Sequence, residues 1–385
     1  MDLINPYTPG AGTRPGDLPG RFEQTAIAMS IADQVDGGRE VNPMIFTGYR
    51  GVGKTSLLFE VRDILRARGW MAGYFEVRRN TDTGDAIRTI VTDSTNQLPN
   101  SGLRAALPKA LAKIGGMRLT AGPAGVSFSV ASGKPITDPY NDLVLFLRSL
   151  GKTARSHSVG VALIVDELQE FLVRDLALLI QALGAVRDEP IVLIGAGLPY
   201  LPADMAKANT YAERFRYESI GFLARADSIE AVTAPAFGQG VIWEPAAAEL
   251  IADKSEGYPF MVQLFASEAW KVADRSPITL ADAEAGVAAG RRQLDNGLYQ
   301  IRYSRLSPRE REYVDTMVHQ MGAGNRAFSG NVADSLGKST QALAPARDRI
   351  IKKGIIASPA AGILEFSVPG FADYVRRVNG WDAVG

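Results

Sequence analysis

The chain has 385 residues, 46% of them hydrophobic and 22% charged, and its 42 Lys and Arg balance 42 Asp and Glu. This length favours two or three domains, and the zero net charge excludes a global field that would draw the whole protein onto nucleic acid or anionic lipid. There is no cysteine and the only histidines are His157 and His319, which excludes disulfides, thiolate metal sites, cysteine nucleophiles and a histidine-rich metal centre.

The first half of the sequence alternates apolar runs with helical patterns. Residues 1–20 hold four prolines and four glycines, a composition that predicts an extended segment, and a short helix is expected from 22 to 35. Apolar runs that predict strands follow at 44–48, 71–77, 161–167, 191–197 and 217–222. Because aliphatic runs that alternate with helices are typical of a parallel sheet covered on both faces, we expect an α/β fold with a five-stranded parallel sheet.

Two regions depart from this alternation. Within residues 98–135, GGMRLTAGPAGVSFSVASG alternates apolar and polar residues around Gly122-Pro123 and Gly125, which predicts a β-hairpin in an insertion. Residues 224–300 are predicted to be helical throughout, and 305–380 form a last unit with its own pattern.

A complete G-x-x-x-x-G-K-T motif, Gly48 to Thr55, follows the first predicted strand. Its glycines allow positive φ, so backbone N–H groups can converge on phosphate oxygens, and the next helix adds its positive dipole end. Lys54 would supply charge to the β- and γ-phosphates, and the Thr55 hydroxyl would ligate Mg²⁺. A chance glycine-rich turn is the alternative, and the position between strand and helix favours a phosphate-binding loop. The residues expected to bind the nucleotide here are Gly48, Arg50, Gly51, Val52, Gly53, Lys54, Thr55 and Ser56.

An acidic pair, Asp166 and Glu167, follows the apolar run from Val161 to Val165. A carboxylate at the tip of a buried strand beside a phosphate loop can hold Mg²⁺ through water, and its neighbour can orient or deprotonate the attacking water. A solvated acidic turn is the alternative. The adjacent glutamate and the absence of an Asn-Lys-x-Asp string indicate a hydrolase-type ATPase rather than a small GTPase.

With these motifs, the sequence resembles the AAA+ and STAND group of P-loop ATPases, particularly archaeal replication-initiator-like ATPases and related bacterial proteins. The resemblance covers nearly the whole chain and rests on GYRGVGKTS, VALIVDELQEF, VLIGAGLP, YAERFRYESIGFL, EGYPFMVQ, REREYVDTM and KKGIIASPAAGILEFSVP. The first two are specific to the superfamily, and the others suggest the subgroup. The resemblance implies ATP or ADP and Mg²⁺ as ligands, a helical lid after the sheet domain, and a nucleotide-dependent homo-oligomer.

Further site residues follow from the resemblance alone. The glycine–arginine pair after the N-terminal strap, Gly20 and Arg21, would lie near the adenine, with a surface linker as the alternative. Arg214 matches the arginine that reaches a γ-phosphate in a neighbouring subunit, with a surface salt bridge as the alternative. Tyr258 and Pro259 match a Gly-x-Pro motif that packs on the base, and a proline at the first helical position is the bland explanation.

The sequence also departs from the family pattern in two places. The fourth strand ends Gly195-Ala196-Gly197, where many AAA+ proteins place a polar residue that senses the γ-phosphate. No arginine begins the GYPFMVQ helix, where many relatives carry a second sensor. Both departures predict slow hydrolysis.

The last unit is predicted to be a winged helix-turn-helix. LSPREREYVDTMVHQ, GNVADSLG and KSTQALAPARDRIIKKGII give three helices, and IIASPAAGILEFSVP gives a two-stranded wing. Because proline clashes with the preceding turn, the third helix is expected to begin near Ala342, with Pro345 in its first turn. Residues 302–385 hold twelve Lys or Arg against eight Asp or Glu, a net charge of +4 that leaves −4 elsewhere. The candidate DNA-binding residues are Lys338, Ser339, Thr340, Gln341, Arg347, Lys352 and Lys353.

Three hypotheses about function remain open at this stage. The first is an ATP-dependent switch that acts on DNA, with a P-loop ATPase domain at 1–223, a helical lid at 224–300 and a winged helix at 301–385. The second is a STAND-like signalling or assembly ATPase whose winged helix binds protein. In the third, ATP is a fixed structural ligand. The chain has no apolar stretch of membrane-spanning length and no signal pattern at its start, so we expect a soluble cytoplasmic protein without a membrane partner.

Overall fold

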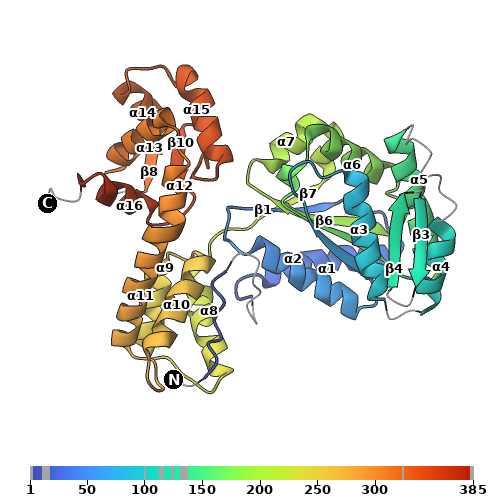
Figure 1. The fold of residues 1–385 in the computed structure, drawn as a ribbon, viewed down its shortest axis with the longest axis horizontal. Helices are drawn as coiled ribbons and strands as arrows, with labels where there is room; N and C mark the ends of the chain where they lie inside the picture. The colour runs from blue at the N-terminus through green and yellow to red at the C-terminus, as the bar shows by residue number, and fades with distance from the viewer. Residues whose placement is uncertain are drawn as a thin grey trace. The chain divides into compact units, whose positions relative to one another are not determined.

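The computed structural model describes residues 3–10, 18–98, 101–111, 117–122, 125–130, 138–322 and 325–381 (Figure 1). The chain forms two compact units. The core unit comprises Gly20–Gly48 and Gly53–Gly221, and the C-terminal unit comprises Met1–Pro19, Tyr49–Val52 and Phe222–Gly385.

A five-stranded sheet with the order β2-β5-β6-β1-β7 forms the centre of the core unit. All neighbouring strands are parallel. The strands are β1 (Met44–Thr47), β2 (Met71–Glu76), β5 (Val161–Asp166), β6 (Ile191–Gly197) and β7 (Arg216–Ser219). They overlap the five apolar runs, although β7 ends at Ser219, three residues before the predicted end at 222. The predicted α/β fold with a parallel sheet is confirmed.

Helices cover both faces of this sheet because the chain reverses direction across it. The connection from β1 to β2 runs one way, and the connections from β2 to β5, β6 and β7 run the other way, so right-handed crossovers place their helices on opposite faces. One face carries α1 (Phe22–Asp36) and α2 (Lys54–Ala67). The other carries α3 (Thr83–Asn96), α5 (Pro139–Ser156), α6 (Val173–Ala185) and α7 (Leu201–Ala208).

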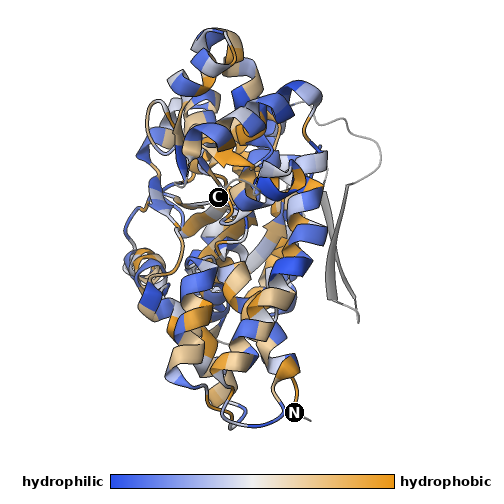
Figure 2. Ribbon diagram, turned by 90° about the vertical axis from the view of Figure 1, so that its left-hand side faces the viewer, coloured by the Kyte–Doolittle hydropathy of each residue, from blue (hydrophilic) through white to orange (hydrophobic). Residues whose placement is uncertain are grey.

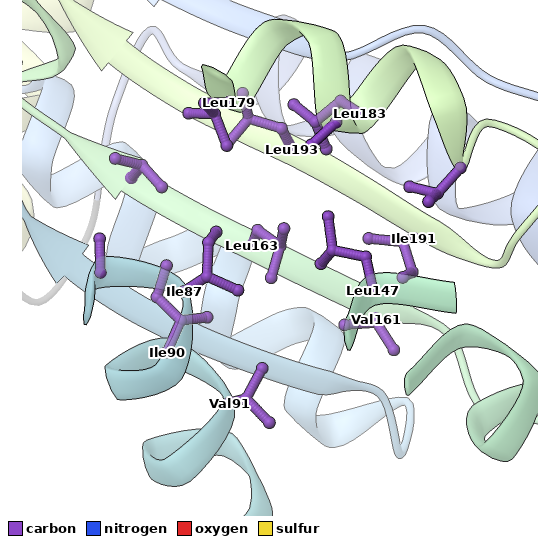
Figure 3. Packing of buried hydrophobic residues seen from close by; sticks show 14 of the residues in the cluster. Ile87, Ile90, Val91, Leu147, Val161, Leu163, Leu179, Leu183, Ile191 and Leu193 are labelled. Carbon is purple, nitrogen blue, oxygen red and sulfur yellow. The ribbon is translucent and has the colours of Figure 1, made fainter. Parts of the chain in front are cut away.

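A buried apolar cluster joins the second set of helices to the sheet. Figure 3 shows Ile87, Ile90 and Val91 of α3 and Leu179 and Leu183 of α6 directed toward strand residues of β5 and β6. A strand that is buried on both faces needs a continuous run of apolar residues. Strands β5 and β6 are such runs, so both could be predicted from the sequence.

The predicted hairpin within residues 98–135 is present. Helix α4 (Ser101–Leu111) precedes β3 (Met117–Gly122) and β4 (Gly125–Val130), which pair antiparallel with Gly122 opposite Gly125. Pro123 and Ala124, between the two strands, lie outside the described residues.

The C-terminal unit begins with a group of helices, as predicted for 224–300. These are α8 (Arg225–Phe237), α9 (Pro245–Ser255), α10 (Pro259–Val272) and α11 (Leu280–Leu294). Helix α11 continues through a π-helical turn, η3 (Asp295–Tyr299), into α12 (Gln300–Ser304) without a break. Figure 2 shows polar and apolar bands alternating around the helices, as expected for helices that bury one side.

The N-terminal segment belongs to this helical group. The Tyr7 side chain is buried, its hydroxyl donates to the Val232 carbonyl oxygen, and it accepts from Trp243 Nε1 at 2.9 Å. Its ring lies edge-on to Trp243 and Trp270, with centroid distances of 6.3 and 6.1 Å. Asn5 Nδ2 donates to Ser267 Oγ at 3.0 Å. Both tryptophans are therefore packing residues.

The last part of the chain, here called the C-terminal region, contains helices with a small antiparallel sheet of order β8-β10-β9. Its helices are α13 (Pro308–Met321), α14 (Ser329–Ser335), α15 (Thr340–Lys352) and α16 (Phe371–Val378). Its strands are β8 (Arg326–Phe328), β9 (Ile356–Ala357) and β10 (Ile363–Phe366). The predicted three helices and two-stranded hairpin are present, and β8 and α16 are additional.

Helix α15 begins at Thr340, earlier than predicted. Ser339 is its N-cap, with Oγ accepting from the Ala342 N–H at 3.2 Å, so the cap sets the start. Pro345 then lies inside the helix and removes the donor that would serve the carbonyl of Gln341, an exposed residue that water can solvate. Among the described residues, no helix combines the length and apolar character needed to cross a membrane.

Candidate nucleotide site

The carboxyl ends of the parallel strands meet at one edge of the sheet, which we call the phosphate edge. Thr47 of β1 lies opposite Gly197 of β6, and Asp166 ends β5 beside Glu76 of β2. The glycine-rich loop leaves β1 at this edge, and the Gly48 N–H donates to the Gly197 carbonyl oxygen at 3.1 Å. The fold thus brings together motifs that are more than 100 residues apart in the sequence.

The loop has the backbone geometry that the motif predicts. Gly51 and Gly53 have φ of 83° and 93°, in the left-handed region that favours glycine. Gly53 is the N-cap of α2, so the first N–H groups of the helix, at Lys54, Thr55 and Ser56, have no helical acceptor. The Lys54 side chain is buried and its Nζ donates to the Gly48 carbonyl oxygen at 2.9 Å. Such a helix N-terminus with a lysine beside it suits a bound phosphate.

Asp166 is the centre of a small polar group at the phosphate edge. Its Oδ2 accepts from the Thr55 hydroxyl at 2.6 Å, and its Oδ1 accepts from the Glu167 N–H at 2.8 Å. Burial raises the pKa of the Asp166 carboxyl, against the opposing effect of the Thr55 hydrogen bond. Burial disfavours the charged form of a carboxylate, and a bound cation would compensate for that cost.

Tyr74 is part of this group and was missed by the sequence reasoning. Its hydroxyl donates to Asp166 Oδ2 at 3.3 Å, and its ring packs on Phe59 of α2 with a centroid distance of 4.5 Å. Burial raises the pKa of the Tyr74 hydroxyl, so it stays protonated and donates. The signal in the sequence is weak, because a tyrosine in a buried strand is ordinary core composition.

The residues present fit a magnesium ion held together with a nucleotide. Thr55 and Asp166 supply two adjacent oxygen atoms, and Mg²⁺ in such sites takes few protein ligands and completes its shell with water and phosphate. Across the described parts of the chain, no group of three or more His, Cys, Asp or Glu side chains could hold a metal by itself.

Glu167 lies next to this pair in an unusual conformation. Its backbone φ is 54° and its ψ is 41°, in the left-handed region. Its carboxylate accepts a hydrogen bond from Gln169 Nε2, a second residue that the sequence reasoning did not single out.

Sequence comparisons agree with this geometry. A family model described as AAA ATPase domain matches residues 17–194, which include the loop, Asp166 and Glu167. This confirms the resemblance to AAA+ ATPases. A second model, for a domain of unknown function (DUF8462), matches residues 296–375. No curated protein matches the chain in sequence.

The chain is similar to several solved structures at low sequence identity. The Walker-type ATPase paby2304 of Pyrococcus abyssi has a TM-score of 0.58 at 16% identity, covering 94% of this chain and 97% of that one. A single-residue variant of RuvB from Thermotoga maritima gives 0.47 at 16%, covering 90% and 92%. The ORC1 protein of Aeropyrum pernix, solved in complex with DNA, gives 0.46 at 12%, covering 94% of both chains.

The predicted glycine–arginine pair lies beside the residues that follow β7. Arg21 caps α1, its side chain is buried, and its Nη2 donates to the Gly221 carbonyl oxygen at 2.7 Å. Gly20 has a φ of 71°. Arg21 thus holds the backbone where β7 has ended, and an adenine contact stays a prediction.

Arg214 lies at the opposite edge of the sheet from the loop. It ends the 3₁₀ helix η2 (Thr210–Arg214), just before β7, and Met44 at the start of β1 lies opposite Arg216. The Arg214 guanidinium is exposed and lies over the Tyr211 ring, 5.7 Å from its centroid. From this edge it cannot contact a phosphate bound in its own loop.

Tyr258 and Pro259 begin helix α10 in the C-terminal unit. Tyr258 is the N-cap residue and Pro259 is the first helical residue, which agrees with the alternative of a proline that begins a helix. The Tyr258 side chain is buried, and its hydroxyl donates to the Arg50 carbonyl oxygen at 2.9 Å. Burial raises the pKa of this hydroxyl. Packing on a base stays a prediction.

The side chains of the candidate DNA-binding residues differ in their exposure and in their contacts with acidic residues. Lys353 Nζ donates to Glu310 Oε2 at 2.6 Å and to the Arg305 carbonyl oxygen at 2.8 Å. Lys338 Nζ lies 3.7 Å from Glu312 Oε2, and Arg347 Nε lies 3.8 Å from Asp348 Oδ1. Thr340 and Gln341 follow the Ser339 cap at the start of α15, and Gln341 and Lys352 are exposed.

Proposed function

We propose that this protein binds ATP with Mg²⁺, hydrolyses it slowly to ADP and phosphate, and uses the bound nucleotide as a switch. The hydrogen bond of 2.6 Å between Thr55 and Asp166 carries the proposal, because it joins the end of the phosphate loop to the tip of β5. The match of residues 17–194 to the AAA ATPase domain model supports it.

Each residue at the phosphate edge has a proposed role. The loop amides and Lys54 would bind the phosphates, with Lys54 exchanging its bond to Gly48 for one to phosphate oxygen. Thr55 and Asp166 would hold Mg²⁺, which neutralises charge on the phosphates when bound. Glu167 would orient the water and accept its proton as the water oxygen attacks the γ-phosphorus and the bond to ADP breaks. Arg214 would serve a neighbouring copy.

Calorimetry and a turnover assay test this proposal. We expect wild type to bind ATP and ADP, and Lys54→Ala to lose at least about tenfold in affinity, because a buried charge-assisted contact is removed. Lys152→Ala, which removes an exposed lysine from α5, is the matched control and should bind as wild type. If wild type gave no heat with either nucleotide, the proposal would fail.

We further infer that the C-terminal region is a winged helix that contacts DNA. Its helix–strand–helix–helix–strand–strand order supports the winged-helix assignment, and its excess of positive charge supports DNA as partner. Lys338, Ser339, Thr340 and Gln341 at the start of α15 would contact bases, and Arg347 and Lys352 would contact phosphates.

A protein partner is the second candidate for this region. The pairing of Lys338, Arg347 and Lys353 with nearby acids favours it, because paired cations attract phosphate less. Titration with duplex DNA at two salt concentrations, with and without ATP, separates the two. Affinity that falls steeply with salt and changes with ATP supports the DNA switch, and binding without salt dependence, or no binding, supports the protein partner.

A further inference from the structure

The short 3₁₀ helix η1 (Leu168–Glu170) fits its side chains against the end of β6. Strand residues two apart face the same side of a sheet, and β6 ends with glycine at both 195 and 197. A Cβ at Gly195 would lie 2.4 Å from Leu168 Cδ1. A Cβ at Gly197 would lie 2.4 Å from Leu201 Cδ2 and 2.7 Å from Gln169 Oε1. The absence of a side chain at Gly195 therefore leaves space for Leu168, and its absence at Gly197 leaves space that Gln169 shares with Leu201.

The Gln169 amide connects the end of β6 to Glu167. The Leu198 backbone N–H donates to Gln169 Oε1 at 3.2 Å, and Gln169 Nε2 donates to Glu167 Oε2. Because a backbone N–H can only donate, the bond from Leu198 fixes which way the amide is turned and directs its NH₂ group at the carboxylate.

Glu167 is in a conformation that needs such support. Its backbone, at φ 54°, is in the left-handed region, which is unfavourable for a residue with a side chain. Its N–H is held by Asp166 Oδ1 at 2.8 Å and its carboxylate by Gln169. Both ends of the residue are therefore fixed by polar contacts at the phosphate edge.

We propose that Gln169 is the positioning residue for Glu167, and that it supplies the polar side chain that β6 lacks at its own end. The proposal rests on the proposed ATPase function, in which Glu167 orients the attacking water. Gln169 transfers no proton itself; it holds the carboxylate at one place, and the Leu198 N–H at the end of β6 holds Gln169.

Two substitutions separate positioning from packing. Gln169→Glu keeps the shape and an oxygen for the Leu198 N–H, and it replaces the donor to Glu167 by a repelling oxygen. Gln169→Met removes both bonds at similar volume. We expect both to lower kcat for ATP at least about tenfold, with KM and ATP affinity within about twofold of wild type. Gln181→Met, an exposed glutamine of α6, is the matched control and should be unchanged.

Combination with Glu167→Gln completes the test. If Gln169 acts through Glu167, Gln169→Glu should add little to the loss that Glu167→Gln causes alone. Full turnover in Gln169→Glu, or losses that multiply in the double variant, would overturn the positioning role while leaving the ATPase proposal intact. If wild type showed no hydrolysis dependent on Glu167, the ATPase proposal would fail and this one with it.

Discussion

The phosphate edge and the C-terminal region satisfy their charged groups in different ways. At the phosphate edge, Thr55 of the loop bonds to Asp166 from a distant motif, and Lys54 bonds to the loop itself. In the C-terminal region, Lys353 and Arg349 are bound to the buried carboxylate of Glu310. In the proposed function, the first set of bonds would be exchanged for bonds to the nucleotide, whereas the second set would stabilise the fold. A basic residue in a pattern is therefore weaker support for a ligand than a motif whose members meet in space.

The strongest test of the phosphate edge is Glu167→Gln. We expect turnover to fall by about 10²- to 10⁴-fold, because the amide cannot accept the proton of water, while ATP affinity is retained. Single-turnover hydrolysis and calorimetry measure the two quantities. Glu23→Gln, an exposed residue of α1, is the control. Equal turnover in wild type and Glu167→Gln would favour ATP as a fixed structural ligand.

Tyr7→Ala tests whether the C-terminal unit depends on its N-terminal segment. Removing a buried ring between two tryptophans should lower the free energy of unfolding by about 3–5 kcal/mol. Tyr7→Phe removes only the hydroxyl and should cost about 1–2 kcal/mol, because the Val232 carbonyl and Trp243 Nε1 lose a partner. Denaturant titration followed by tryptophan fluorescence compares them. Equal stability of both variants would mean that the ring is not a packing element.

Glu310→Gln tests the structural role of the acid in the C-terminal region. Burial alone would raise the pKa of Glu310, but hydrogen bonds from Lys353 and Ser307 lower it to about 2. A lowered pKa means that the carboxylate stabilises the fold above its ordinary value of 4.5, and that this stabilisation is lost as the pH falls toward 2. We expect Glu310→Gln to cost about 2–3 kcal/mol at neutral pH and to flatten stability between about pH 5 and 2, which denaturant titration at several pH values would measure.

Lys352 and Lys353 form a natural pair for the smallest expected effect. Lys352 is exposed and has no ion-pair partner in the part of the chain that the structure describes, whereas Lys353 is bound to Glu310. Lys352→Ala should weaken DNA binding about two- to threefold and reduce the salt slope by about 1, without loss of stability. Lys353→Ala should lower stability instead. If Lys352→Ala lowered stability and Lys353→Ala weakened DNA binding without loss of stability, the roles assigned to the two lysines would be wrong.

Much of the fold could be predicted because β1, β5 and β6 are buried along their whole length. The five runs from 44–48 to 217–222 and the hairpin near Gly122 are local patterns of composition. The loop and Asp166 were predictable for a different reason, since their chemistry fixes both residue type and position.

What the sequence could not provide depends on contacts between distant side chains. In the sequence, nothing distinguishes Gln169 from other polar residues. Only the structure places its side chain against Gly197 at the end of β6. Tyr7 lies in a segment rich in proline and glycine, where nothing local indicates burial between Trp243 and Trp270. The start of α15 was misplaced because the Ser339 cap outweighed the proline rule.

The burial of Tyr7 has a consequence for any attempt to take the protein apart. A fragment that begins at residue 222 would expose the two tryptophans and leave the Trp243 Nε1 donor without its acceptor. Such a fragment should aggregate on its own. A synthetic peptide that spans the first twenty residues should bind the fragment and restore its solubility. The two pieces would then behave as a split protein, with the peptide as the missing half.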